Sequence, residues 1–371
     1  MDLFVYGTLL SHELMAAVAG PGRLNATPAR LDGYAVRPMG DNVVPFIVAA
    51  PGAFCSGVLW RDLTNEQLRR LDAYEGAFGY RLEHVSLAVG ADTVGAQCYM
   101  PPPGIVQGAG DWSFEDWENV HLAPAILAAQ ELFSHRPLPD HGALRRMWPM
   151  IEARAWAKHR AGKGPAQIRH EPRPGDVSIV AAHPPLGSFF RLQSFDLTHR
   201  RFDGKQSHLL VREAFVGVDA AVVLPYDPVR DRVVLVEQFR MGPLVRRDPN
   251  PWMLEPVAGI VDARETPEDA ARRETTEEAG LTLTHLEPVS GYYPSPGSST
   301  EFLHCYVGLC DLPQAATYAG GLASEGEDLR LHPMSLDAAL DLADTGEIAT
   351  GPLVLLLNWL ARHKDRLRRL S

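Results

Sequence analysis

The chain has 371 residues, 46% of them hydrophobic and 22% charged, which suits two or three ordinary globular domains. Its formal net charge of −11 at pH 7 argues against a broad nucleic-acid-binding surface. No apolar run approaches the ~20 residues that would span a membrane, and the acidic Asp2 does not fit a signal peptide. The cysteines lack CxxC spacing, so we interpret them as reduced core thiols of a cytoplasmic protein. They are Cys55, Cys98, Cys305 and Cys310.

The N-terminal segment is predicted to form a strand over Leu3–Val5 that breaks at a glycine turn. Glycine permits a tight turn, and the backbone amides that follow it can point at an anion. The residues of this turn are Tyr6, Gly7, Thr8 and Leu9. A second motif, LDAYEG, spans residues 71–76 and contains Glu75, and Tyr80 and Arg81 follow it.

Together these two motifs resemble the gamma-glutamylcyclotransferase-like (AIG2-like) family. The resemblance implies a small mixed β-barrel over residues 1–105, with the YGTL-type loop holding a gamma-glutamyl substrate. It also implies that Glu75 matches the acid/base of the family, with no metal required. Glu75 would have to be buried beside the Gly7 turn to act as a base near neutral pH. An active cyclotransferase and an inert scaffold or regulatory domain both remain open for this half.

The stretch 106–175 is predicted to be a helical connector and linker, because a PPPG run ends the barrel domain. We expect one helix over Phe114–Val120 and another from Pro124 to Phe133, since proline suits the first helical position. A third helix is predicted over Gly142–Lys158, where Pro149 should kink or split it.

From Val177 onward the sequence alternates strand and turn patterns. The predicted strands begin at Phe189 and then cover His208–Phe215, Val218–Pro225, Arg232–Phe239, Trp252–Val257, Val289–Tyr293, Glu301–Gly308 and Leu329–Met334. A glycine-rich acidic loop covers residues 320–328, and the last helices are predicted after Ser335 and over Pro352–Arg366.

A glutamate-rich helix is predicted among these strands, over Pro267–Ala279, where Thr266 can cap its first turn. Glu274 and Glu278 share one face of it, and Glu277 lies beside them. Like charges at this spacing cost roughly 0.2–0.5 kcal/mol per pair in an isolated helix. A solvated helix is the ordinary interpretation, but a hard divalent cation such as Mg²⁺ would turn the cost into a gain.

The complete pattern extends beyond this helix. Its fixed positions are Gly259, Glu265, Arg273, Glu274, Glu277, Glu278, Gly280 and the apolar Leu281. This pattern resembles the Nudix box, with Thr275 as the one soft position, where the family prefers an aliphatic residue. The resemblance implies a Nudix hydrolase, which cleaves nucleoside diphosphates linked to another group using Mg²⁺ or Mn²⁺. It also implies an α/β/α sandwich over residues 176–371, so the whole chain is predicted to be α+β.

The chemistry of this reaction requires cations, because the negative oxygens of a diphosphate repel a nucleophile. Two or three divalent ions would neutralise those oxygens and acidify a water molecule. Glu274 and Glu278 are the first predicted ligands, and the resemblance adds the backbone carbonyl of Ala258. A nearby base must then take the proton of the water. The candidate bases are Glu277, Glu325 and Glu327.

Several runs outside the box resemble ADP-ribose pyrophosphatases, including VEQFR, PWMLE, an SPGxxxE run ending at Glu301 and the EGED loop. The resemblance makes Glu325 the loop base and Glu327 a supporting metal ligand. The alternative for this loop is an exposed acidic turn.

The same resemblance assigns substrate contacts. Arg212 and Arg240 match phosphate-side and ribose-side contacts, because a guanidinium can fork onto phosphate oxygens. Glu213 matches a polar contact from the partner subunit of a homodimer, and Phe189 an aromatic ring that stacks on adenine. Without the resemblance, each arginine would be interpreted as a surface ion pair and Phe189 as a core residue.

We therefore predict Mg²⁺-dependent hydrolysis of ADP-ribose, or a related ADP-sugar, to AMP and ribose 5-phosphate. The alternatives are a cyclotransferase activity of the N-terminal half and a protein that senses the nucleotide without turnover. We expect a homodimer with no nucleic-acid or membrane partner. The domain order also resembles bacterial tellurite-resistance Nudix proteins, although no residue pattern indicates a tellurium site.

Overall fold

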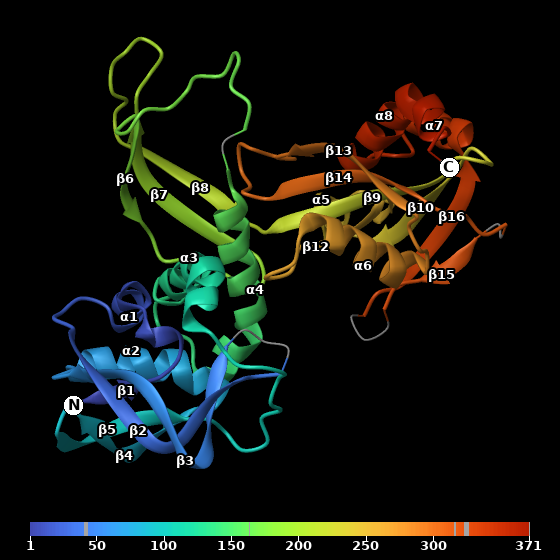
Figure 1. Cartoon of the computed structure of the whole chain (residues 1–371). Helices are drawn as coiled ribbons and strands as arrows, with labels where there is room; N and C mark the ends of the chain where they lie inside the picture. The colour runs from blue at the N-terminus through green and yellow to red at the C-terminus, as the bar shows by residue number, and fades with distance from the viewer. Residues whose placement is uncertain (41–43, 163, 315–316, 323–325, 371) are drawn as a thin grey trace. The chain divides into compact units, whose positions relative to one another are not determined.

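The computed structural model describes residues 1–40, 44–162, 164–314, 317–322 and 326–370. The chain divides into two compact units (Figure 1). The first unit consists of Met1–Pro174 and His183–Phe189, and the second of Gly175–Ala182 and Phe190–Ser371. Within the described ranges, no helix combines the length and the apolar character needed to cross a membrane.

The first unit contains a closed five-stranded barrel with the strand order β1-β3-β2-β4-β5. Its strands are β1 (Leu3–Val5), β2 (Asn25–Pro38), β3 (Pro45–Arg61), β4 (Arg81–Val89) and β5 (Asp92–Met100). Strand β1 runs antiparallel to β3 and parallel to β5, so it closes a mixed barrel. One buried cluster joins side chains from neighbouring strands, including Phe4, Leu31, Leu59 and Leu87. The predicted small mixed barrel is confirmed.

Helices and strands of the first unit share a second hydrophobic core. The helices are η1 (Thr8–Leu10), α1 (His12–Ala19), α2 (Asn65–Glu75), η2 (Gly76–Phe78), α3 (Phe114–Leu132) and α4 (His141–Arg160). This core joins Leu3 and Trp60 of the barrel to Leu14 of α1, Leu71 of α2 and Leu144 of α4. The segment predicted to be a connector thus packs as part of the same unit as the barrel.

Two prolines at which the sequence predicted the start of a helix, or a kink or split, lie inside continuous helices. A single helix, α3, continues through Pro124, where the sequence predicted the start of a second helix. Helix α4 likewise does not split at Pro149. A proline inside a helix removes one hydrogen bond and introduces a clash. Burial of Leu144 and Ile151 on either side of Pro149 outweighs that local penalty.

The second unit is built on an eight-stranded sheet with the main order β13-β14-β9-β10-β16-β15, in which β11 pairs with β10 and β12 with β9. Its strands are β9 (Asp219–Asp227), β10 (Arg232–Phe239), β11 (Trp252–Glu255), β12 (Val257–Ile260), β13 (His285–Tyr292), β14 (Phe302–Leu309), β15 (Tyr318–Gly320) and β16 (Leu329–Ser335). Strand β14 runs parallel to β9, whereas β10 is antiparallel to its neighbours β9, β11 and β16.

Helices cover both faces of this sheet. Helix α6 (Pro267–Ala279) lies on one face, and α7 (Leu336–Thr345) and α8 (Gly351–Leu367) lie on the other (Figure 1). Consecutive residues of β9 point to opposite faces, so Val223 packs in the core beneath α6 and Val222 in the core beneath α7 and α8. The predicted α/β/α sandwich is confirmed.

A separate three-stranded antiparallel sheet precedes the sandwich. Its strands are β6 (Val177–Ala182), β7 (Arg191–His199) and β8 (Leu210–Val216). The end of β8 is tied to the sandwich, because the Phe215 amide donates to the Ser298 carbonyl at 2.8 Å and the Phe215 carbonyl accepts from the Thr300 amide at 3.0 Å. The short helix α5 (Met241–Arg246) has no counterpart in the sequence prediction, because six residues are too few to show a helical period.

The core shared by α4 and the barrel helices can be tested with Leu144→Ala. Leu144 is fully buried, so truncating it should cost about 2–5 kcal/mol of the free energy of unfolding. Amide hydrogen exchange, followed by mass spectrometry on the full chain, should then accelerate in α1 and α2 as well as in α4. Leu357→Ala, in the core beneath α8, is the matched control and should accelerate exchange in the second unit. Exchange that rises only in α3 and α4 of the Leu144 variant would contradict a shared core.

Candidate functional site

Helix α6 has the limits that the sequence predicts. The Thr266 hydroxyl accepts a hydrogen bond from the Asp269 amide, Pro267 occupies the first turn, and Gly280 ends the helix with φ 64°. Because only glycine adopts that backbone conformation without strain, the glycine sets where the helix stops. Glu274, Glu277 and Glu278 therefore fall in its last two turns.

Arg273 organises the carboxylates around this helix. Its guanidinium forms a two-point contact with Glu265, with both N–O distances at 2.9 Å, and donates to Glu274 at 2.7 Å and to Glu277 at 3.0 Å. It also donates to the Ile260 carbonyl at 3.1 Å, which ties the helix to β12. These bonds, led by those to Glu265, raise the pKa of Arg273 further above its usual range. One cation thus offsets the repulsion among three carboxylates.

Gly259 gives the Glu274 carboxylate its place against the sheet. A Cβ atom at position 259 would lie 1.9 Å from both Cδ and Oε1 of Glu274, which no real side chain permits. The glycine of the motif is therefore required by a close approach between strand β12 and the helix. Burial raises the pKa of Glu274, and this effect exceeds the opposing effect of Arg273.

Glu278 is the most buried acid of the motif, with 2% of its surface exposed. Its carboxylate accepts one hydrogen bond from the Ala258 amide at 3.3 Å. The pKa of Glu278 is raised to about 8: burial is the main cause, the Ala258 hydrogen bond opposes it, and the charges of Glu327 and Glu274 add to it. A buried carboxylate with acidic neighbours disfavours its own ionised form unless a cation joins it.

The loop after β15 brings a further acid toward this helix. Glu327 raises the pKa of both Glu274 and Glu278 through its charge, so it lies near them. Its carboxylate accepts from the Leu322 amide at 3.1 Å. Glu325, the predicted loop base, lies outside the described residues.

The chemistry of these side chains, more than their present spacing, suits a hard divalent cation. No group of three or more His, Cys, Asp or Glu side chains in the described part of the chain is close enough to hold a metal ion as it stands. Two observations nevertheless favour one: the buried Glu278 has acidic neighbours, and Gly259 leaves room for Glu274 to lie against β12 beside Ala258. Carboxylate and carbonyl oxygens are the ligands that Mg²⁺ prefers.

Arg240 is the predicted substrate residue that lies among these acids. It donates to Glu255 at 2.6 Å, and its charge lowers the pKa of Glu278 and of Glu301, although burial still raises both. The sequence analysis assigned no role to Glu255, although it stands in the PWMLE run. Its contact joins β11 to Arg240, the residue after β10, and has no short-range sequence signal.

The remaining predicted substrate residues lie elsewhere. Arg212 and Glu213 are exposed on β8, where Glu213 accepts from the Ser194 hydroxyl at 3.1 Å. Phe189 belongs to the first unit, and the Arg154 guanidinium donates to its carbonyl at 3.1 Å. Within the second unit the structure thus groups Arg240 with the carboxylates and places Arg212 and Glu213 on the separate three-stranded sheet.

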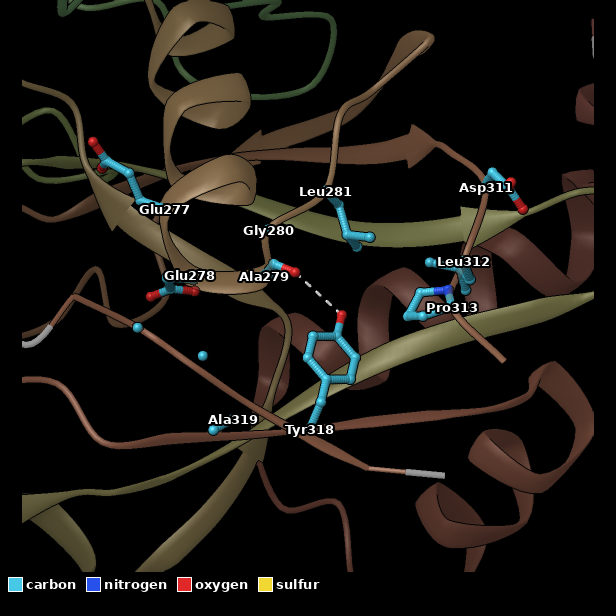
Figure 2. A pocket seen from close by; sticks show the side chains of 12 residues that line it. Glu277, Glu278, Ala279, Gly280, Leu281, Asp311, Leu312, Pro313, Tyr318 and Ala319 are labelled. Carbon is cyan, nitrogen blue, oxygen red and sulfur yellow. Dashed lines mark hydrogen bonds between the residues drawn. The ribbon is translucent and has the colours of Figure 1, made fainter. Parts of the chain in front are cut away.

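A pocket of about 660 Å³ opens at the C-terminal end of α6 (Figure 2). Glu277, Glu278, Asp311 and Tyr318 are among the residues that line it. In Figure 2 the carboxylates of Glu277 and Glu278 point away from Tyr318. The pocket therefore borders the C-terminal end of α6, the part of the helix that carries these acids.

The first unit holds a second group of predicted site residues. Gly7 passes so close to β3 that a Cβ there would lie 2.9 Å from Pro45, and the buried Tyr6 donates to the Tyr99 carbonyl at 3.2 Å. Burial raises the pKa of the Glu75 carboxyl to about 7. After burial, the charge of Glu75 contributes to a raised pKa of Tyr6 and Tyr99, so the structure brings Glu75 near the Tyr6-Gly7 turn. Thr8 and Leu9 continue that turn as η1.

Both halves of the chain match known families. The family described as "Gamma-glutamyl cyclotransferase, AIG2-like" matches residues 3–119, and the family described as "NUDIX domain" matches residues 217–352. Each match lies within one of the two units, and the residues outside both matches include α4, most of α3 and α8, and the three-stranded sheet.

Curated relatives align with the second half. The ADP-ribose pyrophosphatase of Escherichia coli (strain K12) is 42% identical over 195 residues, which cover 52% of this chain and 91% of that protein. The ADP-ribose pyrophosphatase of Haemophilus influenzae is 35% identical over 196 residues, covering 52% and 90%. The GDP-mannose pyrophosphatase of Salmonella arizonae is 34% identical over 175 residues, covering 47% and 88%.

These matches agree with the glutamate-rich helix, its arginine and its glycine as the structure arranges them. The chain therefore belongs to the Nudix family, among the homologues of ADP-ribose pyrophosphatases, and carries an AIG2-like gamma-glutamyl cyclotransferase domain before its Nudix domain.

Proposed function

We propose that the second unit hydrolyses the diphosphate of ADP-ribose, or of a related ADP-sugar, to AMP and ribose 5-phosphate with Mg²⁺. The observation that carries this proposal is the buried Glu278 beside Glu274, with Glu327 near both. Such crowding disfavours the ionised acids unless cations bind between them and the substrate phosphates. The relatives named for ADP-ribose have higher identity to the chain than the one named for GDP-mannose, which supports the adenine nucleotide.

The chain's own residues have distinct parts in this proposal. Glu274, Glu278 and the Ala258 carbonyl would hold the cation, with Glu327 in support. Bound divalent cations supply charge neutralisation on the diphosphate and a more acidic water. Arg240 would fork onto phosphate oxygens, because Glu255 already holds its guanidinium beside the acidic group. Glu325 is the proposed base that takes the proton of the attacking water, with Glu277 and Glu327 as alternatives.

The proposed enzyme acts as a homodimer. Strands β6 and β8 leave apolar side chains more than half exposed, including Val177, Ile179, Val211 and Phe215. A sheet that exposes so many apolar residues is typical of a surface that a partner covers. A second copy of the chain is the proposed partner, and its Glu213 would make a polar contact with the substrate. Arg212 is a proposed phosphate-side contact, and Phe189 the proposed ring that stacks on adenine. The cytoplasmic location remains a prediction.

A second activity is proposed for the first unit, since burial of the Glu75 carboxyl raises its pKa although the residue as a whole is half-buried. In a gamma-glutamyl compound the α-amine would attack the γ-carbonyl carbon, closing 5-oxoproline and releasing the amine of the leaving group. Glu75 would take the proton of the α-amine and deliver it to the leaving amine. Its raised pKa, caused by burial, suits a base that works near neutral pH.

The diphosphatase is tested by Glu278→Gln. The amide keeps the shape and the hydrogen bond from Ala258 but removes the charge, so turnover of ADP-ribose with Mg²⁺ should fall by about a hundredfold or more. Without metal, the midpoint temperature of thermal unfolding should not fall, because a neutral side chain suits this buried position. Product formation is read by mass spectrometry.

Glu268→Gln, exposed in the first turn of the same helix, is the control and should keep activity. Unchanged turnover in the Glu278 variant would end the proposal, and tight binding of ADP-ribose without turnover in the wild type would favour a sensor.

The cyclotransferase is tested by the release of 5-oxoproline from gamma-glutamyl compounds without added metal. The base form is the carboxylate, which predominates above its pKa, so kcat/KM should rise with pH through about 7. Glu75→Gln should reduce the rate about 10²–10⁴-fold, whereas Glu66→Gln, on the exposed side of α2, should not. A wild-type chain that releases no 5-oxoproline from any gamma-glutamyl compound would make this domain a scaffold.

The dimer is tested by Val211→Asp. Val211 is 61% exposed on β8, and burying a carboxylate there against a second copy should weaken self-association by about tenfold or more. Light scattering coupled to size-exclusion chromatography measures the mass in solution. Val229→Asp, 82% exposed in the turn between β9 and β10, is the control and should remain dimeric. A monomeric wild type, or a Val211 variant that remains a dimer, would contradict the proposed interface.

A further inference from the structure

The C-terminus of α6 leaves backbone carbonyl groups that the helix itself cannot satisfy, as every helix end does. The amides of Gly280 and Leu281 turn back onto the carbonyls of Thr276 at 3.0 Å and Thr275 at 3.3 Å. The carbonyls of Glu278 and Ala279 lie beyond this turn, so they need donors from another element.

Strand β15 and the acidic loop that follows it supply one donor each. The Gly321 amide donates to the Glu278 carbonyl at 3.0 Å, and the Tyr318 hydroxyl donates to the Ala279 carbonyl at 3.2 Å. We call this pair of hydrogen bonds the clasp. The clasp joins the start of the acidic loop to the backbone of Glu278, and the side chain of Glu278 is the most buried acid of the site.

The backbone of β15 lies directly against the helix end. A Cβ atom at Gly320 would lie 2.1 Å from the Glu278 carbonyl oxygen, so only a glycine fits without a shift. The other edge of β15 pairs with β16, where Tyr318 opposes Leu331 and Gly320 opposes Leu329. The clasp thus fixes a short strand that the sheet holds on one side and the helix on the other.

Glu327 is hydrogen-bonded to Leu322, the residue that follows Gly321 of the clasp. Its amide donates to the Leu322 carbonyl at 3.3 Å, and its carboxylate accepts from the Leu322 amide at 3.1 Å. At the neighbouring Gly321, a Cβ would approach the Glu327 Cβ to 2.9 Å. The position of the Glu327 carboxylate therefore follows the position of Gly321 and Leu322.

Tyr318 reaches its partner from the side away from the carboxylates. Figure 2 shows its hydroxyl directed at the Ala279 carbonyl, whereas the side chains of Glu277 and Glu278 leave the helix in another direction. Removing that hydroxyl therefore changes the clasp and leaves each acidic side chain intact.

We propose that Tyr318 is a positioning residue for the cation site: its hydroxyl bond to the Ala279 carbonyl holds the loop root so that Glu327 lies near Glu278 and Glu274. Tyr318 itself touches neither cation nor substrate in this proposal. The inference rests on the proposed function, because it assigns the three acids to one divalent cation site.

The test is Tyr318→Phe in the full chain, with Mn²⁺ alone as the probe, so that the readout does not depend on turnover. Electron paramagnetic resonance titration should show Mn²⁺ binding weakened by about three- to tenfold, the range expected when one hydrogen bond outside the ligand set is lost. Hydrogen exchange should accelerate in peptides that contain Gly321. Where ADP-ribose is hydrolysed, the Mg²⁺ concentration for half-maximal rate should rise by a similar factor, with the KM for ADP-ribose at saturating Mg²⁺ unchanged.

Tyr306→Phe is the matched control. The Tyr306 hydroxyl interacts with Glu268 at the opposite end of α6, so its loss should leave Mn²⁺ affinity at the wild-type value. Wild-type affinity in the Tyr318 variant, or an equal loss in both variants, would overturn the clasp. A wild-type chain that binds no Mn²⁺ would instead overturn the proposed function, and the role of Tyr318 would fall with it.

Discussion

The second unit depends on the gathering of like charges at one buried place. Glu278 has 2% of its surface exposed, and its acidic neighbours raise a pKa that burial has already raised. Nothing in the hydrophobic core requires this crowding, and a leucine would be buried there at less cost. Arg273 and Gly259 make it possible, since one offsets the charge and the other vacates the space of a side chain. The surrounding fold therefore maintains an arrangement that the proposed cation would make more favourable.

The sandwich brings separate chain segments to this place. Strand β12 provides Ala258 and Gly259, helix α6 provides the glutamates, and the strand β15 leads to Glu327. Buried residues of β9 and β10 hold the sheet between two helical layers, so the site rests on a packed core. Such support matters because a metal site tolerates only small displacements of its ligands.

The parts of the site that depend on residues close together in the chain could be predicted from the sequence. The limits of α6 follow from Thr266, Pro267 and Gly280, and its acidic face follows from helical spacing. Contacts between distant segments have no such period, so the bonds from Tyr318 to Ala279 and from Arg240 to Glu255 could not be anticipated. Local rules also failed where packing outweighed them. Pro124 and Pro149 lie inside continuous helices, because those helices bury their residues in the core of the barrel unit.

The two units use a buried glutamate in different ways. Burial raises the pKa of Glu75 to about 7, and the groups that feel its charge include the tyrosines Tyr6 and Tyr99. Neutral neighbours allow such a carboxyl to gain and lose a proton, which is what general acid–base chemistry requires. Glu278 is also buried, but its neighbours are carboxylates, so protonation or a cation would relieve the same repulsion. A divalent cation relieves several carboxylates at once, whereas a proton relieves one, and the clustering of acids therefore favours metal binding at Glu278 and proton transfer at Glu75.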